Sequence, residues 1–261
     1  MGDPQNTFTT AGSNDGITWT NLAAGGGWAG QINAPQAFVY NSKYYFHVST
    51  ANDENINLYD WLIGLSDSTG LITTIATIDW SSQISGLKAC YSGEWFQEAS
   101  GTVHLFVPCS GGNSINNMAI YETHALDTTL TTWSNPAAVT VNESNIYDPK
   151  VWLIDGTYYM WLSNQSTRYV ELATASTLLG PYTMQLTGNW AGWGNNKEGP
   201  TMYSTGPSTW RLAVESIFST PNHVMYYSDC NKLDLLSCTW TALQPWTEDH
   251  NYRHGSVLKT Q

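Results

Sequence analysis

The sequence is poor in basic residues. It has 9 Lys and Arg against 21 Asp and Glu in 261 residues, so its formal net charge is −12. A protein that binds nucleic acid or an anionic membrane needs a basic surface to neutralise phosphate, and this composition supplies none. Apolar runs are short, and none approaches the roughly 18 residues of a membrane-spanning helix. We therefore expect neither nucleic acid nor a membrane as a partner.

The four cysteines lack the C-x-x-C spacing of zinc ribbons and thioredoxin-like proteins. They form two closely spaced pairs, 19 and 8 residues apart, and each pair brackets an expected hairpin. We predict the disulfides Cys90–Cys109 and Cys230–Cys238; the alternative is four buried free thiols.

The same features bear on where the protein works. Disulfides, few lysines and the glycosylation sequons at Asn142 and Asn164 are typical of secreted proteins. Nothing at the start resembles a signal peptide, because the first residues are polar at once. We expect a mature secreted, extracellular protein in which Met1-Gly2 stands in place of a leader.

Helical periodicity is nearly absent, whereas aromatic residues are abundant: 13 Trp, 15 Tyr and 6 Phe. So many aromatics exclude an intrinsically disordered chain. Apolar residues occur in short runs rich in Val, Ile, Thr, Tyr and Trp, separated by Gly, Asn, Asp and Ser. This pattern predicts an all-β protein, and 261 residues suit a single domain spanning residues 1–261.

The strands repeat. Residues 33–49 and 147–163 both read as strand, two-residue turn, strand, with a proline near the start and Tyr-Tyr opening the second strand. Looser copies start at Glu94, Glu198 and His254. The five units then open at Ala34, Glu94, Asp148, Glu198 and His254. The successive spacings between these positions are 60, 54, 50 and 56 residues. Propeller blades of four strands need about 40–50 residues, slightly more with loops.

Five units of this size fill the chain, but the last has room for one strand only. The N-terminal segments 7–10 and 14–22 read as an outer hairpin that could complete it. We therefore predict a five-bladed β-propeller whose last blade is closed by N- and C-terminal strands. Such closure removes open sheet edges, and we expect a monomer.

A propeller brings the first strand of each blade to its central axis. The residues that open the units, Ala34, Glu94, Asp148, Glu198 and His254, should therefore face one funnel. Three carboxylates from three blades suit glycosidic hydrolysis, which needs an acid for the leaving oxygen and a base or nucleophile at the anomeric carbon. Trp and Tyr can supply platforms for sugar rings, although most should pack between blades.

These units resemble glycoside hydrolase family 43 and its relatives, five-bladed propellers acting on plant cell-wall glycans. Residues 146–151 with 155–159 are similar to the family's third-blade motif, whose Asp (here Asp148) orients the catalytic acid. Glu198-Gly199-Pro200 is similar to the fourth-blade motif carrying that acid. Arg253-His254-Gly255-Ser256 resembles the last-blade motif, whose His lies under the sugar, often beside a metal ion or water. The resemblance thus implies no required cofactor, and is compatible with a structural calcium ion on the axis.

The sequence departs from the family at the general base, an Asp before Pro in the first blade, where this chain has Ala34-Pro35. Either engineering removed the base or this branch lacks it, as do family members acting on β-1,3-galactan. Glu94 is our candidate for holding the water, with Gln36 and Asn33 as weaker ones. Arg211 and Glu215 could reach the funnel rim as substrate-binding residues.

The implied activity is inverting release of terminal sugars from plant cell-wall polysaccharide, with the two working carboxyls roughly 6.5–9.5 Å apart. Arabinofuranosyl, xylosyl and galactosyl linkages all fit, and the first two are the default. One alternative is a carbohydrate-binding propeller without catalysis, which the absent base would explain. A lyase acting on uronic-acid polymers is disfavoured, because 9 Lys and Arg offer little to neutralise substrate carboxylates.

Overall fold

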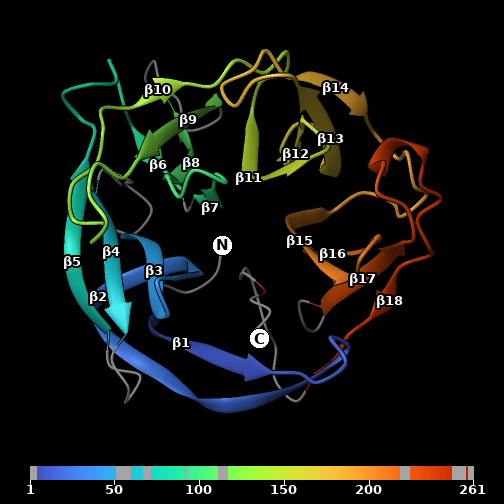
Figure 1. The fold of residues 1–261 in the computed structure, drawn as a ribbon, viewed down its shortest axis with the longest axis horizontal. Coiled ribbons are helices and arrows are strands. Elements are labelled where there is room, and N and C mark those ends of the chain that lie inside the picture. Colours follow the sequence, from blue (N-terminus) through green and yellow to red (C-terminus); the bar gives the residue numbers. More distant parts are fainter. Residues whose placement is uncertain are drawn as a thin grey trace.

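The computed structural model describes residues 5–50, 60–66, 72–91, 93–110, 117–217, 224–248 and 257. For strand residues 5–10, 12, 21–34, 49–50, 60–62 and 66 it describes the backbone alone. Strands dominate this part of the chain, and its sheets stand around a central axis as the blades of a propeller (Figure 1). None of its helical segments has the length and hydrophobicity needed to cross a membrane.

The first sheet has the strand order β1-β2-β3-β4-β5, with β19 paired in parallel to β2. Its strands are β1 (Gln5–Gly12), β2 (Thr18–Tyr40), β3 (Lys43–Thr50), β4 (Asp60–Ser66), β5 (Ile72–Asp79) and β19 (Thr247–Glu248). Between β2 and β3, Asn41 and Ser42 have positive φ angles of 49° and 60°. This is the two-residue type I′ geometry that matches strand twist, and it confirms the predicted turn.

The second sheet has the order β10-β9-β8-β6, with β7 also paired to β8. Its strands are β6 (Ala89–Cys90), β7 (Glu94–Gln97), β8 (Val103–Ser110), β9 (Met118–His124) and β10 (Ala137–Ala138). β6 ends at Cys90 and β7 begins at Glu94, so two short strands replace one inner strand in this sheet.

The third and fourth sheets each have four strands in sequence order. The third contains β11 (Ile146–Ile154), β12 (Thr157–Asn164), β13 (Tyr169–Ala175) and β14 (Thr183–Leu186). The fourth contains β15 (Lys197–Gly206), β16 (Thr209–Ser216), β17 (Val224–Cys230) and β18 (Gln244–Pro245), with the short 3₁₀ helix η1 (Leu235–Ser237) before β18. Asp155 and Gly156 again form the predicted two-residue turn, with φ angles of 48° and 77°.

The all-β propeller prediction is confirmed, but the number of blades is wrong: the described residues form four sheets instead of five. The reason is that β2 runs unbroken from Thr18 to Tyr40 and pairs with β1 at one end and β3 at the other. The outer hairpin expected in a separate last blade is therefore continuous with the first. Apart from Val257, the other strand expected there, starting at Arg253, lies outside the described residues.

Consecutive residues of the middle strands pack on opposite neighbours, as the period-2 alternation of a strand requires. On β12, Met160 contacts the core between the second and third sheets, and Trp161 the core between the third and fourth. On β8, Leu105 faces the first sheet and Phe106 the third. Because both faces of each sheet are apolar, the sheets need neighbours on both sides, and a ring satisfies this requirement.

The N-terminal hairpin closes the ring against the fourth sheet. Trp19 packs on Trp246 with ring centroids 4.8 Å apart, and the carbonyl oxygen of Gly16 accepts hydrogen bonds from Arg211 Nη1 (2.9 Å) and Tyr203 Oη (3.1 Å). Asp15 shapes the turn by accepting backbone N–H bonds from Thr18 and Ile17, and these bonds lower the pKa of Asp15 below its usual value. The turn between β1 and β2 is thus part of the ring closure.

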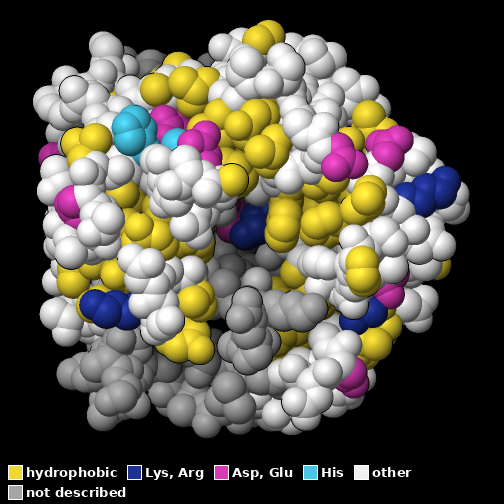
Figure 2. Space-filling view, viewed as in Figure 1, with side chains coloured by type: hydrophobic (Ala, Val, Ile, Leu, Met, Phe, Trp, Pro, Cys, Tyr) yellow, Lys and Arg dark blue, Asp and Glu magenta, His cyan; other side chains and the backbone are white. Residues whose placement is uncertain are grey.

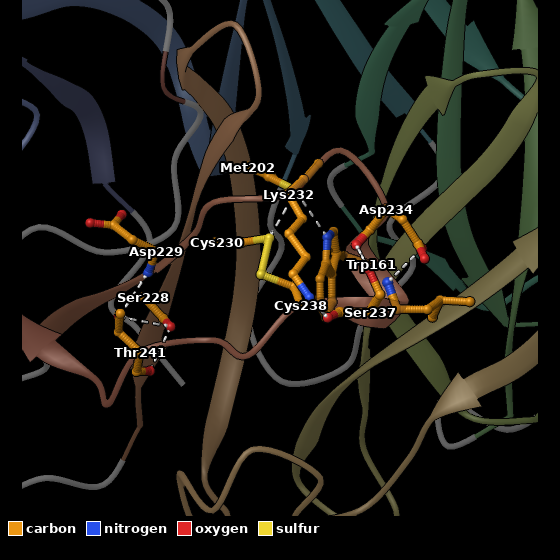
Figure 3. The surroundings of a disulfide bond; sticks show 11 residues. Trp161, Met202, Ser228, Asp229, Cys230, Lys232, Asp234, Ser237, Cys238 and Thr241 are labelled. Atoms are coloured by element: carbon orange, nitrogen blue, oxygen red, sulfur yellow. Dashed lines mark hydrogen bonds between the residues drawn. A yellow bond between two sulfur atoms is a disulfide. The ribbon is translucent and has the colours of Figure 1, made fainter.

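Both predicted disulfides are present, so the alternative of free thiols is wrong. Cys90 and Cys109 are directly paired residues of β6 and β8. Cys230 and Cys238 bracket η1 and pack over Trp161, whose Nε1 lies 3.3 Å from Met202 Sδ (Figure 3). This second disulfide therefore fixes the loop that covers the core between the third and fourth sheets.

Candidate active site

Three inner strands carry the same irregularity, an X-Pro bulge. The pairing register shifts at Ala34-Pro35 in β2, at Asp148-Pro149 in β11 and at Gly199-Pro200 in β15. Proline lacks an N–H, so it is tolerated in a sheet mainly at bulges and edges, and a bulge redirects the side chains beside it. The proline repeated in the sequence therefore corresponds to a bulge repeated in three sheets. Two of the bulged strands, β11 and β15, lie beside the central axis of the ring (Figure 1).

Asp148 joins the third sheet to the fourth. It has a positive φ of 49°, and its Oδ2 accepts hydrogen bonds from Ser163 Oγ (2.8 Å) and from the backbone N–H of Gly199 (3.0 Å). Ser163 is itself buried. Asp148 is thus hydrogen-bonded to the residue directly after Glu198, which brings the third-blade and fourth-blade motifs together.

Glu198 and Glu215 are directly paired residues of β15 and β16, so their side chains project from the same face of the sheet. Glu198 is 9% exposed and Glu215 is fully buried. The strand register therefore places a second carboxyl group beside the predicted acid.

Glu94 is also buried, at the start of β7, and it forms an ion pair that the sequence analysis missed. Lys150 Nζ on β11 lies 2.6 Å from Glu94 Oε2. Lys150 is two residues beyond Asp148, on the other side of the bulge. Among the described residues, basic and acidic side chains are visible in the hollow at the centre of the face in Figure 2.

Gln36 lies on the first sheet, opposite His47. Both side chains are buried, and burial lowers the pKa of His47 to about 3, so the imidazole is neutral. The Oε1 atom of Gln36 has no hydrogen-bond partner among the described residues, while its backbone oxygen accepts from Trp95 Nε1 at 3.0 Å. Asn33 and Ala34 are in β2, but their side chains lie outside the described part, as does all of His254.

Arg211 was predicted to reach the funnel rim. In the structure it contacts Asp229 of its own sheet and Gly16 of the turn that closes the ring. Its Nε and Nη2 donate to the two carboxylate oxygens of Asp229 at 2.7 and 2.8 Å, and its guanidinium lies 4.1 Å from the Tyr227 ring centroid. It is four residues from Glu215 along β16, about 13 Å at strand spacing. The strand register thus places Arg211 away from the Glu198–Glu215 pair.

We expect Arg211→Lys to destabilise the fold by about 1–2 kcal/mol, because lysine keeps the charge but loses the bidentate fork. The expected loss of stability is no larger because the Asp229 side chain is 39% exposed, so water already screens the ion pair. Urea unfolding measures the change. A stable variant with weakened sugar binding would instead restore the predicted substrate role.

Comparison with known proteins supports the propeller fold. No protein-family model matches the chain, and no curated protein matches its sequence. A thermostable family-43 glycoside hydrolase superposes with a TM-score of 0.70 at 15% identity, covering 94% of this chain and 90% of that one. A family-43 β-xylosidase/α-arabinofuranosidase from a compost microbial metagenome, solved with xylotriose, gives 0.62 at 15% identity, covering 81% and 77%.

An exo-β-1,3-galactanase from Clostridium thermocellum gives a TM-score of 0.60 at 13% identity, covering 82% of this chain and 48% of that chain. At such identities the likeness concerns the fold. Any inference about chemistry therefore rests on the side chains of Asp148, Glu198 and Glu94 themselves.

Proposed function

We propose that the protein is a secreted glycoside hydrolase that releases terminal sugars from plant cell-wall polysaccharide with inversion. The observation that carries the proposal is the hydrogen bond from the Gly199 N–H to Asp148 Oδ2, at 3.0 Å. It links the two motifs that resemble the catalytic motifs of family 43. The two disulfides support an oxidising, extracellular location.

In this mechanism Glu198 is the general acid. It gives its proton to the glycosidic oxygen while the bond from that oxygen to the anomeric carbon breaks. This role requires Glu198 to carry a proton at the working pH, and its side chain is buried beside that of Glu215. Asp148 holds the backbone after Glu198 and so orients the acid without touching the reacting atoms.

Glu94 is the proposed base. A water molecule attacks the anomeric carbon from the opposite face and loses its proton to the Glu94 carboxylate, so the sugar leaves with inverted configuration. The 2.6 Å contact with Lys150 fixes the position of the Glu94 carboxylate. No step requires a cofactor.

The proposed substrates carry xylosyl, arabinofuranosyl or galactosyl linkages. The similar xylosidase/arabinofuranosidase supports the first two, and the galactanase supports the third. We favour xylosyl and arabinofuranosyl substrates, and we propose that the protein acts as a monomer.

A second candidate function is carbohydrate binding without catalysis. Two observations favour it: the first-sheet bulge carries Ala34 where the family has its base, and the Glu94 carboxylate is paired with Lys150. This function predicts sugar affinity with no product.

The test is to incubate the protein with xylo-oligosaccharides, arabinan and β-1,3-galacto-oligosaccharides and to follow products by chromatography and proton NMR. We expect free monosaccharide whose first-formed anomer is inverted. Retention of configuration would exclude Glu94 as a base acting through water. Unsaturated sugar would identify a lyase, and binding without product would favour the second candidate.

A further inference from the structure

A cluster of two histidines and one glutamate lies outside the candidate active site, on β8 and β9. Its members are His104, Glu122 and His124, with candidate ligand atoms all within 4.8 Å of one another. The Nδ1 atoms of His104 and His124 lie 2.6 and 3.2 Å from the same atom, Glu122 Oε1. Figure 2 shows histidine side chains beside acidic ones over the second sheet.

The strand register explains this convergence. His104 and His124 are directly paired residues of β8 and β9, and Glu122 is two residues before His124, so all three project from one face of the sheet. His104 and Glu122 are buried, whereas the His124 side chain is 41% exposed. The cluster therefore has a rigid, buried base and an opening to solvent.

The donor atoms and their spacing suit a transition metal. Ligands about 2.0–2.2 Å from a tetrahedral Zn²⁺ lie about 3.3–3.5 Å apart, so small side-chain adjustments would admit the ion. Imidazole nitrogens favour Zn²⁺ over the oxygen-seeking Ca²⁺ and Mg²⁺. Two protein nitrogens and one carboxylate oxygen would leave a coordination position for water.

An outer partner for His104 is also in place. Its Nε2 atom is buried, has no hydrogen-bond partner among the described residues, and lies 3.8 Å from Glu98 Oε2. A histidine that binds metal through one ring nitrogen commonly directs the other toward a carboxylate, which fixes the ring orientation. Glu98 is suitably placed for that role after a small movement.

The cluster is separate from the proposed catalytic carboxylates. Phe106 on β8 pairs with Glu94 on one side and Glu122 on the other, so its buried ring stands between the two carboxylates. The ring of Phe96 packs against His104, 5.9 Å between centroids. Within the described part of the chain, the ion pairs of the cluster join His104 and His124 to Glu122, and His104 to Glu98.

We propose that His104, Glu122 and His124 form a binding site for a divalent transition metal of the Zn²⁺ type, with Glu98 as the outer partner of His104. The site is independent of the proposed hydrolase function, and binding can be measured without any substrate.

The test uses the full chain without an affinity tag, titrated calorimetrically with Zn²⁺ alone and then with Ca²⁺ alone. We expect one equivalent of Zn²⁺ and no comparable Ca²⁺ binding. Glu98→Gln should weaken Zn²⁺ binding by about 10–100-fold, and His124→Gln by more than about 100-fold. His124 is partly exposed, so this variant should fold, which circular dichroism checks.

Glu143→Gln is the matched control, because Glu143 is an exposed carboxylate outside the cluster, and it should leave the affinity unchanged. Co²⁺ offers a second measurement, since a four-coordinate nitrogen and oxygen site gives intense visible absorption. Absence of Zn²⁺ binding by the unaltered chain, or equal binding by folded His124→Gln and Glu122→Gln proteins, would overturn the proposal.

Discussion

Glu198→Gln should lower the rate of sugar release from an unactivated oligosaccharide by about 10²–10⁴-fold, the usual contribution of a positioned general acid. Glutamine has nearly the same shape as glutamic acid but cannot give a proton to the leaving oxygen. Since Glu198 is buried and paired with Glu215 across the strands, the variant should keep its fold and its ability to bind sugar. Initial rates and substrate affinity, measured separately, test this expectation.

The leaving group provides a sharper version of the experiment. A nitrophenyl glycoside expels a stable phenolate that needs little protonation, so the same substitution should slow its cleavage far less. Glu143→Gln, a matched change at an exposed carboxylate, should alter neither rate. If Glu198→Gln retained full activity on the oligosaccharide, the acid would have to be another residue.

Local features of the sequence predicted much of the fold. Proline at a fixed distance before Tyr-Tyr marked two of the three bulged inner strands, β2 and β11, and Asn41-Ser42 and Asp155-Gly156 marked two-residue turns. Such features depend on residues close together in the sequence, so tertiary contacts change them little. The blade number was wrong because nothing local distinguishes one long strand, Thr18–Tyr40, from two shorter ones in different sheets.

The partners of the site residues could not be predicted in the same way. Nothing in the residues next to Lys150 indicates its partner. Its side chain contacts Glu94, 56 positions away, because β7 and β11 belong to neighbouring sheets. Likewise, His104 and Glu122 are joined only by the register of β8 and β9. Glu122 and His124 alternate along one strand, but this spacing by itself identifies only a shared strand face.

Lys150→Met should destabilise the protein by about 3–5 kcal/mol, because it leaves the Glu94 carboxylate buried without its cation. Both side chains are largely shielded from water, with 12% of Lys150 and 5% of Glu94 exposed, so solvent would replace little of the lost interaction. Urea unfolding of the single variants Lys150→Met and Glu94→Gln, and of the double variant, measures the coupling between the two side chains.

The double variant separates a structural ion pair from a catalytic one. Removing both charges should recover most of the stability lost in Lys150→Met, since a buried ion pair and a neutral pair of similar volume are often close in free energy. Sugar release should not recover, because the base would still be missing. A double variant that is stable and fully active would show that the Glu94–Lys150 pair serves the fold alone. The water-activating group would then have to be sought near the first-sheet bulge, where Gln36 and His47 are described polar residues.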